Sequence, residues 1–97
     1  MPAYLILFKY TQKGAAAIKE SPKRVEQAME IAKKLGGNVK TFYLLMGQFD
    51  TVFLLEAPDD ETATKISMAI SSLGNVSTQT MRGFTLDEFK KMTSELS

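Results

Sequence analysis

The sequence contains no cysteine, no histidine and no tryptophan. Without cysteine there can be no disulfide bond, no thiolate nucleophile and no cysteine-ligated metal. Without histidine there is no imidazole general base, no histidine-ligated haem or zinc, and no charge switch near neutral pH. Any catalysis would depend on Asp, Glu, Lys, Tyr or Arg side chains, or on a bound cofactor. We expect no metal site and no cofactor.

A strong charge imbalance and a long apolar run are missing too. The 12 basic and 11 acidic residues give a net charge of +1. This near-neutral balance argues against a nucleic-acid partner, which would need a clear positive excess. No apolar run approaches the ~20 residues of a membrane span, so we expect no membrane partner. Met1, Pro2 and Ala3 lead straight into an apolar strand pattern, which predicts no signal peptide and a cytoplasmic protein.

The 97 residues predict one domain over residues 1–97. Apolar, β-branched and aromatic runs predict four strands, and helical periodicity with start and stop signals predicts three helices. Ser21 followed by Pro22 is a helix start in which Ser21 would be the cap. The expected strands are Tyr4–Tyr10, Val39–Met46, Thr51–Glu56 and Val76–Arg82. The expected helices run from Ser21 to Leu35, from Pro58 to Leu73 and from Leu86 to Leu96, with a helical turn within Thr11–Glu20.

A short internal echo supports an arrangement of two βαβ halves. Leu35–Val39 and Leu73–Val76 each end a helix with Gly and Asn and then open a strand. Two such halves predict an α+β, ferredoxin-like βαββαβ fold with an antiparallel four-stranded sheet and a short C-terminal helix. In the usual strand order 4-1-3-2, the first and third strands are central, and these are the most apolar. The fourth is an edge strand and is polar.

Both faces of the central strands are apolar, although two helices can cover only one face. Residues of the first strand alternate Ile6 and Phe8 on one side with Leu5 and Leu7 on the other. An exposed apolar patch of that size is a liability in a monomer. We therefore expect a homodimer or a larger assembly of the dimeric α/β-barrel type. The alternative is that the C-terminal helix folds back over the second face.

The most distinctive local sequence is Gly47-Gln48-Phe49-Asp50, between the second and third strands. One interpretation is a hairpin turn, in which Gly47 takes an unusual backbone angle and Asp50 accepts hydrogen bonds from nearby amides. The other makes Gly47, Phe49 and Asp50 part of the rim of a ligand pocket. The two interpretations are compatible.

Charged residues also occur at strand positions: Lys9, Glu56 and Arg82. A charge in a sheet is either paired or directed at a ligand. We treat all three as candidate ligand-binding residues, with Lys9 and Arg82 holding an anionic group and Asp50 orienting an amine or hydroxyl. No residue is assigned a catalytic role.

Several ordered motifs resemble the GYD domain family. They are Met46–Val52, Glu56–Glu61, Gly74–Val76, Arg82-Gly83-Phe84 and Asp87-Glu88-Phe89. The resemblance covers essentially the whole chain and implies a small protein of a family without an established activity. Phe49 stands where the family usually has Tyr, so any role of that phenol hydroxyl does not carry over.

The turn at Gly47–Asp50 and the strand Val76–Thr80 are also similar to the effector-binding domain of Lrp/AsnC regulators. That similarity implies a ferredoxin-like domain that dimerises or assembles further and binds amino acids between subunits. Because the chain has no helix-turn-helix segment, a DNA-binding regulator is not implied. The function predicted is a homo-oligomeric small-molecule-binding or regulatory module with a small anionic or amino-acid-like ligand. The alternative is a cofactor-independent enzyme, such as a monooxygenase or isomerase, with Asp50, Glu56 or a Tyr as base.

Overall fold

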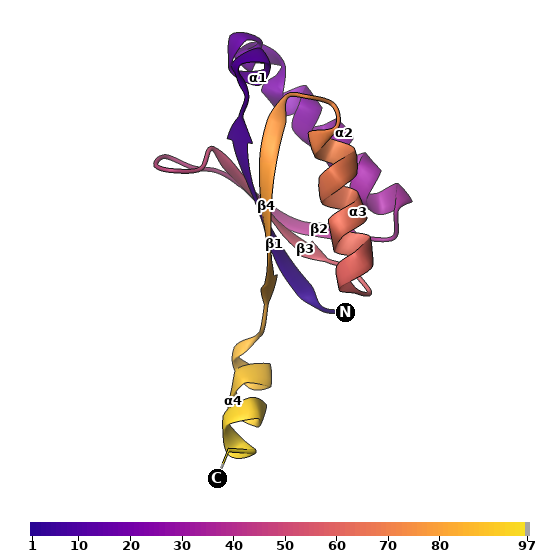
Figure 1. The fold of residues 1–97 in the computed structure, drawn as a ribbon, viewed down its shortest axis with the longest axis vertical. Helices are drawn as coiled ribbons and strands as arrows, with labels where there is room; N and C mark the ends of the chain where they lie inside the picture. Colours follow the sequence, from indigo (N-terminus) through magenta and orange to yellow (C-terminus); the bar gives the residue numbers. More distant parts are fainter. Residues whose placement is uncertain (97) are drawn as a thin grey trace.

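The computed structural model, which describes residues 1–96, has the expected βαββαβ order followed by a C-terminal helix (Figure 1). The strands are β1 (Ala3–Tyr10), β2 (Asn38–Leu44), β3 (Thr51–Glu56) and β4 (Val76–Gly83). The helices are α2 (Ser21–Lys34), α3 (Asp60–Ser71) and α4 (Leu86–Ser94), and the predicted helical turn is a short α1 (Gln12–Ala16) followed by the 3₁₀ helix η1 (Ile18–Glu20). The ferredoxin-like fold is confirmed.

The four strands form one antiparallel sheet in the order β2-β3-β1-β4, which is the predicted order. In the β1–β3 pair, Leu5 lies opposite Leu54 and Ile6 lies opposite Phe53. Cross-strand partners point to the same side of a sheet and successive residues to opposite sides. The register therefore assigns each strand residue to one of two faces.

The core lies between one face of the sheet and helices α2 and α3, which Figure 1 shows on the same side. We call this the covered face. Its buried strand residues are Tyr4, Ile6, Phe8, Phe53 and Leu55, and the helices contribute Ala28, Ala32, Ala63, Ile66 and Ile70. Phe53 meets the rings of Phe8 and Phe42 edge-on, at centroid distances of 5.0 and 6.1 Å. Small alanines on the helices allow them to approach these aromatic strand residues closely.

Two of the three longer helices have side-chain caps at their starts. The Asp59 side chain accepts a hydrogen bond from the Thr62 amide, and Thr85 and Glu88 form a reciprocal capping box. The prediction for Ser21 was wrong: it is the first residue of α2 and makes no cap. Its hydroxyl lies 2.7 Å from the hydroxyl of Tyr10 instead. A partner from β1 thus replaces the local backbone amide.

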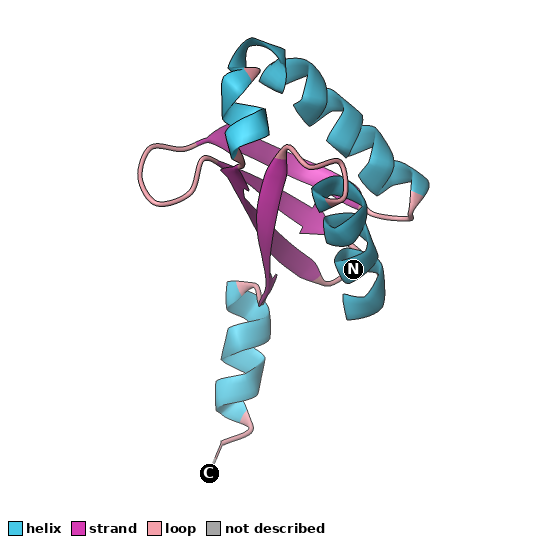
Figure 2. Cartoon of the chain, turned by 45° about the horizontal axis from the view of Figure 1, so that its top comes forward, coloured by secondary structure: helices cyan, strands magenta, loops and turns pink. Residues whose placement is uncertain are grey.

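The C-terminal helix α4 does not fold back over the sheet. It continues beyond the end of β4 and projects away from the other elements (Figure 2). Throughout Leu86–Ser94 no residue is buried, and Phe89 is 58% exposed. The alternative in which this helix covers the second face of the sheet is therefore wrong for this chain. Within residues 1–96, no helix is long and apolar enough to span a membrane.

Candidate functional site

The second sheet face is apolar at its centre and has no helix over it in the part of the chain that the structure describes (Figure 1). We call this the open face. Its apolar side chains, assigned from the strand register, are Leu5, Leu7, Tyr43, Val52, Leu54 and Met81. Leu54 is 37% exposed, Met81 40% and Tyr43 59%. Adjacent apolar side chains left in water in this way are typical of an interaction surface.

One end of the sheet carries the hairpin residues predicted to surround a ligand. Gly47 has φ +121°, the left-handed backbone region that favours glycine, which confirms its turn role. Asp50 lies beside β1, where its backbone amide donates to Phe8 and its Oδ2 accepts from the Tyr10 amide at 2.8 Å. The carboxylate thus extends the β1–β3 pairing by one hydrogen bond, just before β3 begins at Thr51. This confirms that Asp50 accepts from a nearby amide.

Lys9 belongs to the same end of the sheet. Its Nζ lies 6.0 Å from the centre of the Phe49 ring, within the range of a cation–π contact. Among the described residues, Lys9 has no carboxylate within 4.0 Å. The structure therefore brings Lys9, Phe49 and Asp50 together in one cluster, which we call the hairpin cluster.

Glu56 and Arg82 lie toward the other end of the sheet. Glu56 is opposite Ala3 and makes a 4.0 Å ion pair with Lys40. Arg82 is opposite Tyr4, whereas Lys9 is opposite Ser77. Five strand residues, about 16 Å, separate those positions. Within one chain, Lys9 and Arg82 therefore do not form the joint anion site that we expected.

Arg82 is held by aromatic rings and by a carboxylate. Its guanidinium lies 4.2 Å from the ring centre of Phe84 and 5.6 Å from that of Tyr4. It also pairs with Glu88 at 4.0 Å and donates to the carbonyls of Ala3 and Gly83. These contacts link β4 to the first turn of α4. Structural contacts therefore account for this charge without a ligand.

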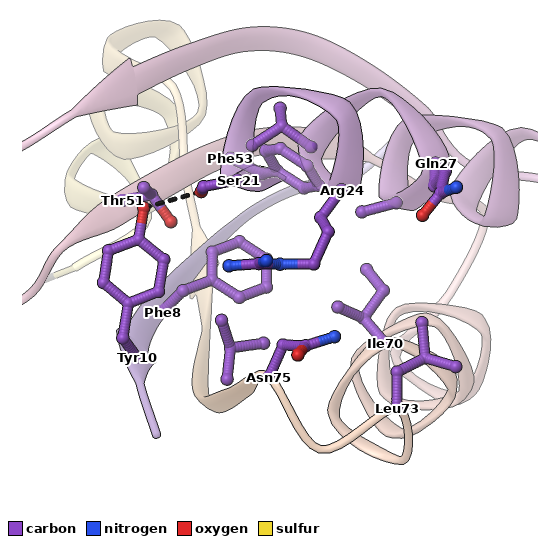
Figure 3. A pocket seen from close by; sticks show the side chains of 13 residues that line it. Phe8, Tyr10, Ser21, Arg24, Gln27, Thr51, Phe53, Ile70, Leu73 and Asn75 are labelled. Carbon is purple, nitrogen blue, oxygen red and sulfur yellow. Dashed lines mark hydrogen bonds between the residues drawn. The ribbon is translucent and has the colours of Figure 1, made fainter. Parts of the chain in front are cut away.

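Two hollows lie elsewhere, beneath and beside the start of α2, and none of the six predicted ligand residues lines them. The first is a cavity of about 60 Å³ between the sheet, α2 and the end of α3 (Figure 3). The second, of about 330 Å³, is an apolar groove toward β2. Tyr10, Ser21 and Val25 line both, so the Tyr10–Ser21 hydrogen bond lies between them. The polar side chains around the cavity are Tyr10, Ser21, Arg24, Gln27, Thr51 and Asn75.

The sequence interpretation missed Arg24. It lies one turn into α2, directly before Val25, which is partly buried against the core. A cation next to an apolar residue of the predicted helix was the available signal.

The titratable groups give limited support for acid–base chemistry. Burial, followed by a 2.5 Å hydrogen bond to Asp60, raises the pKa of Tyr4 to about 12. A phenol that donates to a carboxylate in the core is a poor base at neutral pH. In residues 1–96 there is no group of three or more Asp and Glu side chains close enough to hold a metal ion. The geometry provides binding groups more clearly than catalytic ones.

An antiparallel ferredoxin-like sheet with one open face defines the structural class of this protein. The sequence profile of the GYD domain family matches residues 4–93. The chain therefore belongs to the GYD domain family, which confirms the resemblance drawn from its motifs.

Comparisons with individual proteins agree with this class. Over 82 residues the chain is 29% identical to the glutamine synthetase and cystathionine beta-lyase binding protein of Thermus thermophilus, across 84% of this chain and 86% of that protein. A crystal structure of a protein from the same organism superposes with a TM-score of 0.58 and 24% identity, over 88% of this chain and 95% of that one. The leucine response regulatory protein of Mycobacterium tuberculosis superposes with a TM-score of 0.66 and 15% identity, over 87% of this chain. This chain spans about half of that regulator, covering 51% of it. At these identities the structural similarities establish the fold alone.

Proposed function

We propose that this GYD-family protein is a homo-oligomeric binding or regulatory module whose open face packs against a second copy. The observation that carries this proposal is the apolar open face, with Leu54 and Met81 more than a third exposed. Transfer of apolar surface out of water stabilises association by roughly 25 cal/mol per Å² before the costs of binding. A two-fold pairing would bring the same patch of both copies together.

Charges at the two ends of the open face support one orientation of the pair. Lys9 and Glu56 both project from this face, and six strand residues, about 20 Å, separate their positions. A two-fold axis that lies between the two packed sheets and runs perpendicular to the strands would place Lys9 of each copy opposite Glu56 of the other. Opposite charges placed in this way favour this antiparallel orientation of the two copies and disfavour the parallel orientation.

The hairpin cluster is our proposed ligand site, at the edge of the same face. One carboxylate oxygen of Asp50 is used by the Tyr10 amide, and Oδ1 accepts no hydrogen bond within the described residues. Lys9 offers a cation for an anionic group, and Phe49 offers a ring face. A small amino-acid-like ligand would suit this combination, with further contacts from a second copy.

A relative gives independent support for a binding role. The T. thermophilus protein is named for binding glutamine synthetase and cystathionine beta-lyase. For this chain we propose only the same general role, which is binding other molecules rather than converting a substrate. A partner protein is one candidate for the bound molecule.

A thermal-shift screen of L-amino acids at pH 7 tests the ligand site. We expect at least one compound to raise the melting temperature of the wild type, and Asp50→Asn to abolish that shift. Asn can still accept the Tyr10 amide, so the free variant should lose only ~1 kcal/mol or less of stability. Gln48→Asn, in the same turn, is the matched control and should keep the response. A shift that survives Asp50→Asn unchanged would contradict the proposed site.

A further inference from the structure

The cavity beneath α2 combines apolar walls with a charged side chain, a composition that core packing does not require. Its walls are apolar, with Phe8, Phe53, Ala28 and Ile70 among the lining residues. At its mouth lies Arg24, the one charged residue among the described lining residues of either hollow. Figure 3 shows the Arg24 side chain extending across the cavity, between the Tyr10–Ser21 pair and Asn75.

The Arg24 guanidinium has partners but no counter-ion. It donates to the carbonyl oxygens of Ala17 and Gly14 at 2.9 and 3.0 Å, and both belong to the segment between β1 and α2. Within residues 1–96 no carboxylate comes within 4.0 Å of it, since the three ion pairs involve other residues. A guanidinium has five N–H donors, so three stay available. A half-buried cation without an anion beside an apolar cavity is an arrangement that an anionic ligand would complete.

We propose that this cavity binds a small monocarboxylic acid with a short apolar chain, the carboxylate paired with Arg24 and the chain against Phe8 and Phe53. A planar guanidinium suits the two oxygens of one carboxylate, whereas a phosphate dianion is usually held by several cations or by a helix N-terminus. The side-chain amides of Gln27 and Asn75 also line the cavity, and amides of this kind can donate to a carboxylate oxygen.

The same lining selects against amino acids. None of the described lining residues is an Asp or Glu that could receive an α-ammonium group. Adding that ammonium to the ligand would place a second cation beside Arg24 and the apolar walls, which is unfavourable without a carboxylate partner. The site is separate from the hairpin cluster and does not depend on it.

Three probes with one carbon skeleton test the ligand class: propanoate, L-alanine and propan-1-ol. Their short chains suit a cavity of about 60 Å³. Titration calorimetry and thermal shift on the full chain at pH 7 should show saturable binding of propanoate. The alcohol, which lacks the charge, and alanine, which adds the ammonium, should bind at least about tenfold more weakly. Equal binding of the alcohol or of alanine would overturn the proposal, and so would no binding of the acid.

Variants assign the interaction to the cavity. Arg24→Gln should weaken binding of propanoate by roughly tenfold or more. Because Arg24 also holds Ala17 and Gly14, that variant is expected to be less stable. Ala28→Met therefore serves as the second variant: it fills the cavity from α2, leaves Arg24 in place, and should also abolish binding. Arg82→Gln is the control and should bind the acid as the wild type does. Unchanged binding in Arg24→Gln or in Ala28→Met would place the acid elsewhere and overturn the proposal.

Discussion

The two faces of the sheet are built from the same strands, yet they differ sharply in what covers them. On β3, Phe53 is 1% exposed beneath the helices, whereas its neighbour Leu54 is 37% exposed on the open face. On β1, Ile6 and Leu5 make the same contrast of buried and half-buried side chains. Both faces are apolar at the centre, so composition alone does not distinguish them. What distinguishes them is that α2 and α3 lie on one side only.

This difference is the basis of the association that we propose. The covered face is completed within the chain, by helix residues such as Ala32 and Ile66 that are fully buried. The open face has no equivalent within the described residues, since α4 projects away from it. An apolar sheet face that the chain's own helices leave uncovered fits a surface that a second copy covers.

Substitutions at adjacent β3 positions give the largest expected effect. Phe53→Ala removes a fully buried ring and should lower the free energy of unfolding by about 3–5 kcal/mol. Leu54→Ala should cost less than about 1 kcal/mol in the dissociated chain, because its side chain is partly in water there. Urea unfolding at several protein concentrations measures both. The Leu54 effect should grow with concentration, because the variant weakens association.

Equal losses for the two variants in dilute protein would show that both faces contribute equally to the fold of a single chain. The comparison between the faces would then be wrong. A loss at Leu54 that is independent of concentration would argue against association through this face.

A smaller effect concerns the phenol on the covered face. The pKa of Tyr4 is raised to about 12 by burial and then by Asp60, while an unfolded tyrosine titrates near ~10. The unfolded chain therefore loses this proton first as the pH rises. The stabilisation is complete below about pH 10 and is lost as the pH rises toward 12. Two pKa units correspond to roughly 2–3 kcal/mol.

Urea unfolding from pH 9 to 11.5 checks this pH dependence. Wild type should lose stability over that range more steeply than Tyr4→Phe, in which the titrating group is gone. Tyr43→Phe, from the exposed position on the open face, is the matched control and should follow the wild type. Parallel curves for wild type and Tyr4→Phe would contradict the assigned burial of this phenol.

The fold was predictable because local and long-range signals agree. The stops at Gly36 and Gly74 and the helix start at Ser21-Pro22 each mark an element boundary that the structure keeps within a few residues. The apolar composition of the first and third strands also agreed with their central places in the predicted strand order. Because the local boundary signals and the expected fold agree, the order of the elements could be predicted from one sequence.

The site was less predictable because it depends on register and on tertiary partners. Lys9 and Arg82 both lie near the C-terminal ends of their strands, and the antiparallel β1–β4 pairing sets these positions at opposite ends of the sheet. Ser21 has the local signature of a helix cap, but Tyr10 supplies its partner from a distant strand. Arg24 carries no motif, and its lack of a counter-ion emerges only when α1 and α2 are packed together.

Sedimentation equilibrium at micromolar concentration tests the central claim, that the open face is covered by a second copy. We expect wild type to sediment at twice the 10.8 kDa of one chain. Lys9→Glu and Glu56→Lys should each weaken the dimer, and the double variant should restore it, since each end of the face would again meet the opposite charge. Wild type that sediments as a clean 10.8 kDa monomer would contradict the account.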